Sequence, residues 1–280
     1  MNIAVIGLGL IGGSFCKAIK SYTKHAVLGL DADPNVQKEA INSGAIDQII
    51  TEKQLHQADL SILALYPEAS IQFVEQNRAA FRPGSIVMDT CGIKQKVVEA
   101  IEPLFSGTGV LYVGTHPMAG REFSGFDYAL ADLYQGASFI ITPTEQTDKS
   151  AIQTVTDLAE HLGFGRIVHA TPQEHDRIIA YTSQLAHVVS SAYVKSPTLK
   201  AESGFSAGSF KDLTRVAKLN PEMWTSLFLD NRTALLTELD ALLDHLREYR
   251  TALEIQDRQK LFELLEDGNE RKIWSLNHSK

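Results

Sequence analysis

The stretch NIAVIGLGLIGGSF, residues 2–15, decides the fold of this chain. It combines an apolar run over residues 2–7, the glycine pattern GLGLIG over residues 7–12 and a helical pattern over residues 11–19. In such a strand–loop–helix unit the first glycine permits a tight turn, the second lets the backbone approach a pyrophosphate, and the third lets helix and strand pack closely. The residues expected to contact a dinucleotide here are Gly7, Gly9, Leu10, Ile11 and Gly12.

The next predicted strand, residues 26–30, ends in an acidic residue. Asp31 follows the glycines after about 20 residues, as the dinucleotide fingerprint requires. A carboxylate at this point accepts hydrogen bonds from a ribose 2′-hydroxyl and repels a 2′-phosphate, which favours NAD over NADP as the cofactor. A purely structural glycine turn with a solvated Asp31 is the alternative.

Up to about residue 170, short apolar runs alternate with helical patterns such as the one over residues 149–162. Strands that alternate with helices indicate right-handed crossovers. We therefore expect an α/β fold with a Rossmann-like, doubly wound, largely parallel sheet. The remaining strands are predicted at residues 60–65, 85–89, 110–114, 138–142 and 166–169.

The pattern changes after residue 170. Thr171 and Pro172, with Glu174 close behind, are typical of a helix start, and no convincing strand follows. The sequence therefore predicts an NAD-binding Rossmann domain over residues 1–170 and an all-helical domain over residues 171–280. A leucine stripe at helical spacing favours a buried core or a dimer interface over a ligand site. Its members are Leu235, Leu236, Leu239, Leu242, Leu243 and Leu246.

The composition argues against several classes of protein. The chain is 44% apolar and 21% charged, which is typical of a globular protein, and its net charge of −8 disfavours nucleic acid as a partner. No apolar run approaches the roughly 20 residues that span a membrane, and the first residues lack the basic segment of a signal peptide. The two cysteines, Cys16 and Cys91, suit a reducing cytoplasm and lack the spacing of metal ligands, so we expect no metal site.

Open parallel sheets bind ligands outside the carboxyl ends of their strands. Three segments are predicted to lie there, residues 65–67, 89–94 and 114–120. His116 stands out because it lies in a Gly/Pro turn and titrates near neutrality, so that it can accept the proton of a hydroxyl. A histidine that only caps the turn is an equal alternative. His175, just after the helix start, is expected to cap or pack rather than to react.

Several segments together resemble one enzyme family. They are GTHPMAGRE (residues 114–122), SQLAH (residues 183–187), GSFKDLTRVA (residues 208–217) and PEMW (residues 221–224). In this order, and after the glycine loop, they resemble the prephenate and arogenate dehydrogenases. The histidine turn and the FKDLTR segment are together much more specific than the glycine fingerprint.

The resemblance implies an NAD-dependent oxidative decarboxylation of prephenate to 4-hydroxyphenylpyruvate in tyrosine biosynthesis. His116 matches the family's catalytic histidine, which accepts a hydrogen bond from the C4 hydroxyl. Arg215 matches an arginine that anchors a substrate carboxylate, and the helical domain is expected to bind substrate and to form a homodimer. Other substrate contacts are expected from His187, Trp224, Gly92, Lys94 and Arg121, and other cofactor contacts from Leu65 and Pro67.

The chain departs from its relatives at Gly92, where many carry a serine whose hydroxyl helps to bind the C4 hydroxyl. A backbone N–H, a water molecule or a larger role for His116 then has to substitute. Binding two substrate carboxylates requires cations, and each candidate has a solvated surface position as its alternative. These cations are Arg215, Arg121, Lys94 and Lys211. Arogenate as the substrate, another two-domain reductase and a non-catalytic NAD-binding sensor are the alternative functions.

Overall fold

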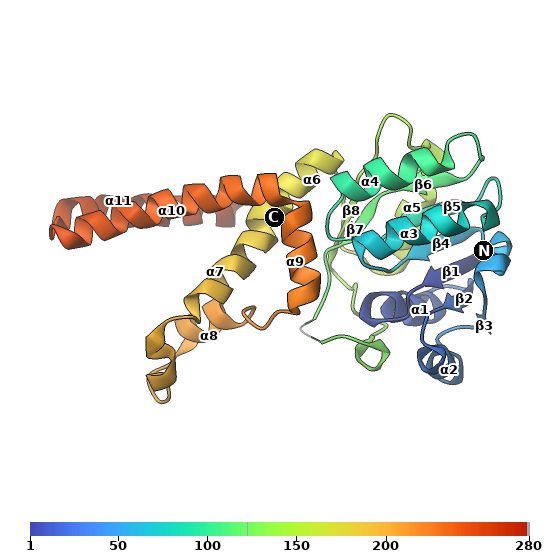
Figure 1. Ribbon diagram of the computed structural model, residues 1–280, viewed down its shortest axis with the longest axis horizontal. Coiled ribbons are helices and arrows are strands. Elements are labelled where there is room, and N and C mark those ends of the chain that lie inside the picture. The colour runs from blue at the N-terminus through green and yellow to red at the C-terminus, as the bar shows by residue number, and fades with distance from the viewer. Residues whose placement is uncertain (122, 279–280) are drawn as a thin grey trace. The chain divides into compact units, whose positions relative to one another are not determined.

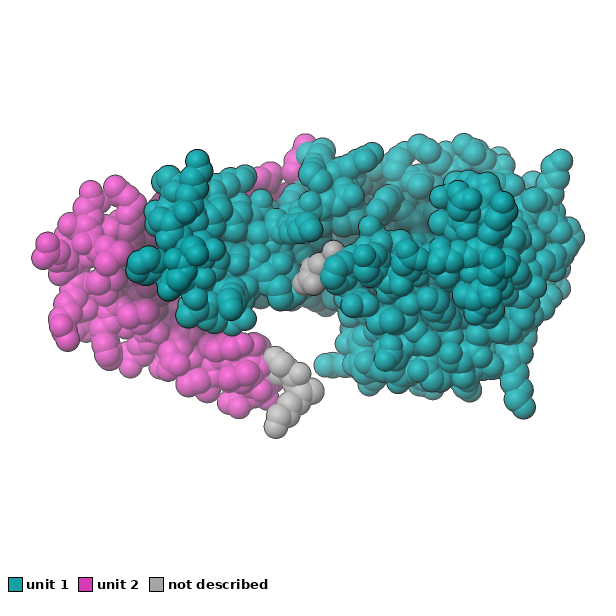
Figure 2. Space-filling view, turned by 90° about the horizontal axis from the view of Figure 1, so that it is seen from below, with its two compact units in different colours: residues 1–231 teal, residues 232–280 magenta. Residues whose placement is uncertain are grey.

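The computed structural model describes residues 1–121 and 123–278. Glu122, the last residue of the GTHPMAGRE motif, lies outside the described residues, as do Ser279 and Lys280. The chain divides into two compact units, Met1–Asn231 and Arg232–Lys280 (Figure 2). Within the described part of the chain, no helix is long and apolar enough to cross a membrane.

The first unit is built on a six-stranded parallel sheet. Its strands are β1 (Asn2–Ile6), β2 (Ala26–Leu30), β3 (Gln48–Ile49), β4 (Leu60–Leu63), β5 (Ile86–Asp89) and β6 (Leu111–Val113). They lie in the order β3-β2-β1-β4-β5-β6. From β1 the chain first adds strands on one side of the sheet and then, from β4 on, on the other side. Rossmann folds bind their dinucleotide at this switch point between β1 and β4. The predicted parallel Rossmann-like fold is confirmed; β3 was not predicted, because two residues are too few to show a pattern.

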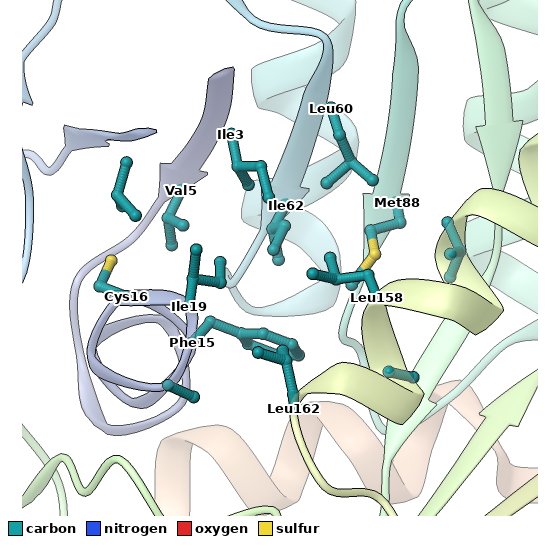
Figure 3. Close-up of a cluster of buried hydrophobic side chains, with 14 of the residues drawn as sticks. Ile3, Val5, Phe15, Cys16, Ile19, Leu60, Ile62, Met88, Leu158 and Leu162 are labelled. Carbon is teal, nitrogen blue, oxygen red and sulfur yellow. The ribbon is translucent and has the colours of Figure 1, made fainter. Parts of the chain in front are cut away.

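Helices cover both faces of this sheet (Figure 1). The main ones are α1 (Leu10–Tyr22), α2 (Pro34–Asn42), α3 (Pro67–Asn77), α4 (Gln95–Ile101) and α5 (Lys149–His161). Alternate side chains of β1 point to opposite faces, as the two-residue period of a strand requires. Ile3 and Val5 join a buried cluster with Phe15 of α1 and Leu158 of α5 (Figure 3), whereas Ala4 joins a second cluster with residues of α3 and α4.

A second, three-stranded sheet follows in the order β7-β8-β9. It consists of β7 (Thr115–Pro117), β8 (Ser138–Ile141) and β9 (Arg166–His169), with β7 antiparallel and β9 parallel to β8. Two of the predicted strands therefore lie outside the main sheet. The break is at Gly114, where a Cβ atom would lie 2.6 Å from the Thr142 hydroxyl and 2.8 Å from the Val98 side chain. This close approach sends the chain from β6 directly into the strand that carries His116.

The rest of the first unit is helical. Thr171 caps α6 by accepting a hydrogen bond from the Glu174 backbone N–H at 3.1 Å, which confirms the predicted helix start. The helices are α6 (Pro172–Ile179), a π-helical segment (Ala180–Leu185), α7 (Ala186–Tyr193), α8 (Gly208–Thr214) and α9 (Pro221–Asp230). The second unit contains α10 (Arg232–Glu254) and α11 (Arg258–His278). Short 3₁₀ helices lie at Glu52–Gln57, Arg78–Ala80, Glu102–Phe105, Phe126–Tyr128 and Pro197–Ala201.

Candidate active site

The glycine loop has the shape that a dinucleotide phosphate requires. Gly7 has a φ of 87°, and a Cβ atom there would lie 2.5 Å from the Ala64 carbonyl oxygen. A Cβ at Gly12 would lie 1.8 Å from the Gly7 carbonyl oxygen, whereas one at Gly9 meets nothing within 4 Å. Gly7 and Gly12 are thus needed for the turn and the packing, and Gly9 leaves open space at the uncapped N-terminus of α1.

Asp31 ties this loop to the end of β2. Its Oδ2 accepts a hydrogen bond from the Leu8 backbone N–H at 2.6 Å, and its Oδ1 accepts one from the Asp33 N–H at 2.9 Å. A carboxylate has about four acceptor positions, so this half-buried group keeps capacity for ribose hydroxyls. The sequence predicted the ribose contact but not the bond that holds the loop.

The end of β4 faces the same switch point. Leu65 is half-buried two residues after this strand, and Pro67 is buried as the first residue of α3. Leu10 and Ile11, in the first turn of α1, are half-buried as well. Their placement is compatible with the predicted cofactor contacts, which stay predictions.

His116 is the first member of a chain of hydrogen-bonded side chains. Its Nδ1 lies 2.9 Å from Nε2 of His175, and Nδ1 of His175 lies 2.7 Å from an Asp176 carboxylate oxygen. Asp176 in turn accepts hydrogen bonds from the backbone N–H groups of Lys94 at 2.7 Å and Gln95 at 2.9 Å. The start of α4 therefore fixes the carboxylate, the carboxylate fixes His175, and His175 fixes the ring of His116.

These hydrogen bonds determine which nitrogen of each histidine ring carries the proton. An ionised carboxylate only accepts, so His175 donates from Nδ1 and its Nε2 is left to accept the proton of His116 Nδ1. Burial lowers the pKa of His116 well below its usual range, and the adjacent His175 and the Lys94 ammonium lower it further. Burial also lowers the pKa of His175, although the hydrogen bond to Asp176 opposes this change. Nε2 of His116 is consequently unprotonated and able to accept a proton.

Gly92 leaves space next to that nitrogen. A Cβ atom at Gly92 would lie 3.8 Å from Nε2 of His116, which is ordinary van der Waals distance, and the φ of Gly92 does not require glycine. The sequence predicted that Gly92 and His116 share one site, and the structure brings them together. The sequence did not predict the role of His175 and Asp176. The only signal there was a His-Asp pair just after a helix start.

Lys94 does not lie where the sequence predicted. Its side chain is completely buried, and its ammonium forms an ion pair with Asp89 and donates a hydrogen bond to the Thr115 carbonyl oxygen at 2.5 Å. An ammonium held in this way does not reach a substrate carboxylate, so the predicted substrate contact is wrong. The sequence could not show this, because a lysine that follows a strand can be exposed or buried without any difference in the local pattern.

A second group of predicted residues lies in the helical part of the first unit. The rings of His187 and Trp224 stack with their centroids 3.9 Å apart, and Nδ1 of His187 bonds the Ser183 carbonyl oxygen at 2.8 Å. Burial lowers the pKa of His187, and the charge of Arg215 lowers it further, so Arg215 influences the His187 ring electrostatically. The π-helical segment ends two residues before His187, and such segments are frequent at functional sites.

Arg121 and Lys211 are both exposed. The guanidinium of Arg121 lies 5.3 Å from the centre of the Phe123 ring, and Phe123 stacks on Tyr128 with ring centroids 4.8 Å apart. Their predicted roles as substrate-binding cations stay predictions. Among the described residues, no cluster of histidine, cysteine and acidic side chains is arranged to hold a metal ion.

Comparison with protein families covers both halves of the chain. Residues 15–168 match the nucleotide-binding domain of prephenate dehydrogenase, and residues 171–267 match its dimerization domain. The chain belongs to the prephenate dehydrogenase family. It is thus an oxidoreductase with a nucleotide-binding domain, and NAD is the cofactor that its glycine loop and Asp31 fit.

Relatives of this family member are named after different substrates. The cyclohexadienyl dehydrogenase of Zymomonas mobilis is 32% identical over 97% of this chain and 95% of its own length. The prephenate dehydrogenase of A. aeolicus, solved with hydroxyphenyl propionate and NAD+, has a TM-score of 0.88 and 28% identity over 98% of this chain and 97% of its own. The arogenate dehydrogenase of Synechocystis has a TM-score of 0.84 and 28% identity over 97% of this chain and 99% of its own.

Proposed function

We propose that this chain oxidises prephenate with NAD and releases carbon dioxide, which yields 4-hydroxyphenylpyruvate and NADH for tyrosine biosynthesis. The observation that carries the proposal is the series of hydrogen bonds from His116 through His175 to Asp176, which leaves Nε2 of His116 as the acceptor next to Gly92. When bound, NAD accepts the hydride from the carbinol carbon. The described side chains then have to accept a proton, hold the substrate and position both.

His116 supplies the proton transfer. Its Nε2 accepts the proton of the C4 hydroxyl as the C–O bond gains double-bond character, and this makes the ring an imidazolium. Asp176 stabilises the resulting positive charge through His175, as a buried carboxylate does for a catalytic histidine elsewhere. Loss of carbon dioxide makes the substrate ring aromatic and gives its C4 oxygen the character of a phenolate. His116 then returns the proton to that oxygen. The proton balance of the histidine is therefore zero over one turnover.

Arg215 is proposed to anchor a carboxylate of the substrate, because a guanidinium binds a carboxylate with two parallel hydrogen bonds. His187 and Trp224 are proposed to line the same pocket, since their stacked rings offer an apolar surface to the substrate ring. The low pKa of His187 keeps this ring neutral next to Arg215. Gly92 and Arg121 are proposed as further substrate contacts.

Prephenate is preferred over arogenate in this proposal. The two differ in one group, since arogenate carries an ammonium where prephenate carries a keto oxygen. An ammonium calls for an acidic partner, and we assign no acidic side chain of the described chain to that role. The cyclohexadienyl and arogenate dehydrogenases among the relatives make arogenate the second candidate.

The test is reduction of the nicotinamide, with NAD and NADP crossed against prephenate and arogenate. We expect fast NADH formation with NAD and prephenate. A preference for arogenate would change only the substrate. Silence in all four combinations, with NAD binding shown by calorimetry, would refute the enzymatic proposal and favour a non-catalytic NAD sensor.

We also propose a cytoplasmic homodimer formed through residues 171–280. The matched dimerization domain supports association, and both cysteines are free thiols. In the second unit, large apolar side chains of α10 are between 39% and 63% exposed, which favours a protein surface as their partner. They are Leu236, Leu243, Leu246 and Leu253. Sedimentation should show a dimer that Leu243→Glu with Leu246→Glu converts to monomers; a monomeric wild type would refute it.

A further inference from the structure

The proposed mechanism does not use the most deeply buried charged pair of the described chain. Lys94 and Asp89 are both completely inaccessible to solvent, and they contact each other at the carboxyl end of β5. Burying two charges costs several kcal/mol per ion, and replacing such a pair by apolar side chains is often neutral or stabilising. Stability alone therefore does not explain the pair, and a positional or electrostatic role has to be considered.

The pair holds the residue that directly precedes the catalytic histidine. Lys94 donates to the Thr115 carbonyl oxygen at 2.5 Å, and the Thr115 N–H donates to the Asp89 carboxylate at 3.3 Å. The Thr115 hydroxyl also donates to the Asp89 carbonyl oxygen. All three polar groups of Thr115 are thus engaged by these two residues, so that the start of β7 has one position relative to β5.

The remaining acceptor capacity of Asp89 is filled as well. The Tyr112 hydroxyl donates to it at 2.8 Å from β6, and the Cys91 N–H donates at 2.9 Å. Burial and the Asp89 charge raise the pKa of both Tyr112 and Cys91, so both remain uncharged. Apart from these two uncharged groups, the ionisable side chains linked to His116 among the described residues are Lys94 and Asp89, which contact Thr115, and His175 and Asp176.

We propose that Lys94 and Asp89 form a positioning pair for His116, which fixes the ring through Thr115 and sets the balance of charge behind it. This inference rests on the proposed role of His116 as the base. The Lys94 ammonium lowers the pKa of His116 and of His175, whereas Asp89 raises the pKa of His175. Removal of either partner leaves the other charge uncompensated next to the histidine chain.

The two single variants should therefore act in opposite directions. In Lys94→Met the unpaired carboxylate favours imidazolium, so the acidic limb of the pH profile of kcat/KM should move to higher pH. In Asp89→Asn the unpaired ammonium disfavours imidazolium, so the limb should move to lower pH. Each variant should also lower kcat by about 10- to 100-fold, the usual loss when a supporting partner is removed, with NAD affinity unchanged.

Tyr112→Phe is the matched control, because it removes a hydrogen bond to the same carboxylate without changing any charge. It should lower the melting temperature and leave the acidic limb in place. The pKa of His116 in each variant, measured by NMR of labelled imidazole without substrate, tests the inference even if the proposed reaction fails. If one single variant does not fold, the direction of the other decides. Shifts of the same sign, no shift, or an equal shift in Tyr112→Phe would overturn the proposal.

Discussion

His116 and Arg215 lie in opposite surroundings. His116 is half-buried on a short strand, and every polar group behind it, from His175 to Asp176, has a partner inside the protein. Arg215 is exposed and follows α8, a helix of seven residues. A general base has to be held within a fraction of an ångström and in one tautomer, whereas a carboxylate anchor has to be reachable from solvent. The group that reacts is thus enclosed with its partners, whereas the group that binds faces solvent.

The largest expected effect is that of His116→Asn. Loss of the proton acceptor should lower kcat by roughly 10²–10⁴-fold, the usual share of a general acid–base group. NAD affinity should not change, because the glycine loop is separate from the histidine turn. Stopped-flow turnover and NAD titration check both points, with the exposed His161→Asn as a matched control. Near-normal turnover in His116→Asn would remove this residue from the mechanism.

Asp176→Asn should have the next largest effect. The amide cannot accept from His175 and from the N–H groups of Lys94 and Gln95 at once, so the tautomer of His116 is no longer fixed. We expect kcat to fall by about 10- to 100-fold while KM for prephenate stays near its original value. Glu174→Gln changes an exposed carboxylate of the same helix and is the control. An effect on KM alone would show that Asp176 supports binding rather than the base.

Arg215→Ala should act on binding instead. A hydrogen bond to a charged group contributes about 1.5–3 kcal/mol, so KM for prephenate should rise by about tenfold or more with little change in kcat. Lys211→Ala removes an exposed cation from the same segment and should have a much smaller effect. Steady-state kinetics decide between them: an unchanged KM in Arg215→Ala places the anchor elsewhere, and equal rises in both variants indicate only a general loss of positive charge.

The smallest effect concerns stability in acid. The folded protein holds His116, His175 and His187 with lowered pKa values, whereas in the unfolded chain they titrate near pH 6.5. The unfolded state therefore binds more protons below that pH, and the free energy of unfolding should fall by up to about 1.4 kcal/mol per pH unit for each histidine. Urea unfolding between about pH 7 and about pH 5 measures the slope, which should be shallower in His116→Asn. An equal slope in that variant would mean that His116 titrates alike in both states.

The fold was largely predictable because its signals are local. The strand–glycine–helix pattern and the cap at Thr171 each act over a few residues, and Asp31 follows the glycines at the expected spacing; the structure contains all three. The separate second sheet was not predictable, since the break at Gly114 depends on contacts with Thr142 and Val98 from other elements. The domain boundary predicted at residue 170 stays a prediction; the division into compact units falls after Asn231.

The sequence by itself determined the parallel Rossmann-like fold, the dinucleotide loop and the choice of His116 as a candidate base, because each depends on backbone conformation or residue type at close spacing. Only the tertiary structure decided which groups support that base. His175 and Asp176 lie about 60 residues further along the chain, and Lys94 turns inward to Asp89 instead of outward to a substrate. Burial and hydrogen-bond partners of this kind arise only when the ends of β5, β6 and β7 meet, so no local pattern records them.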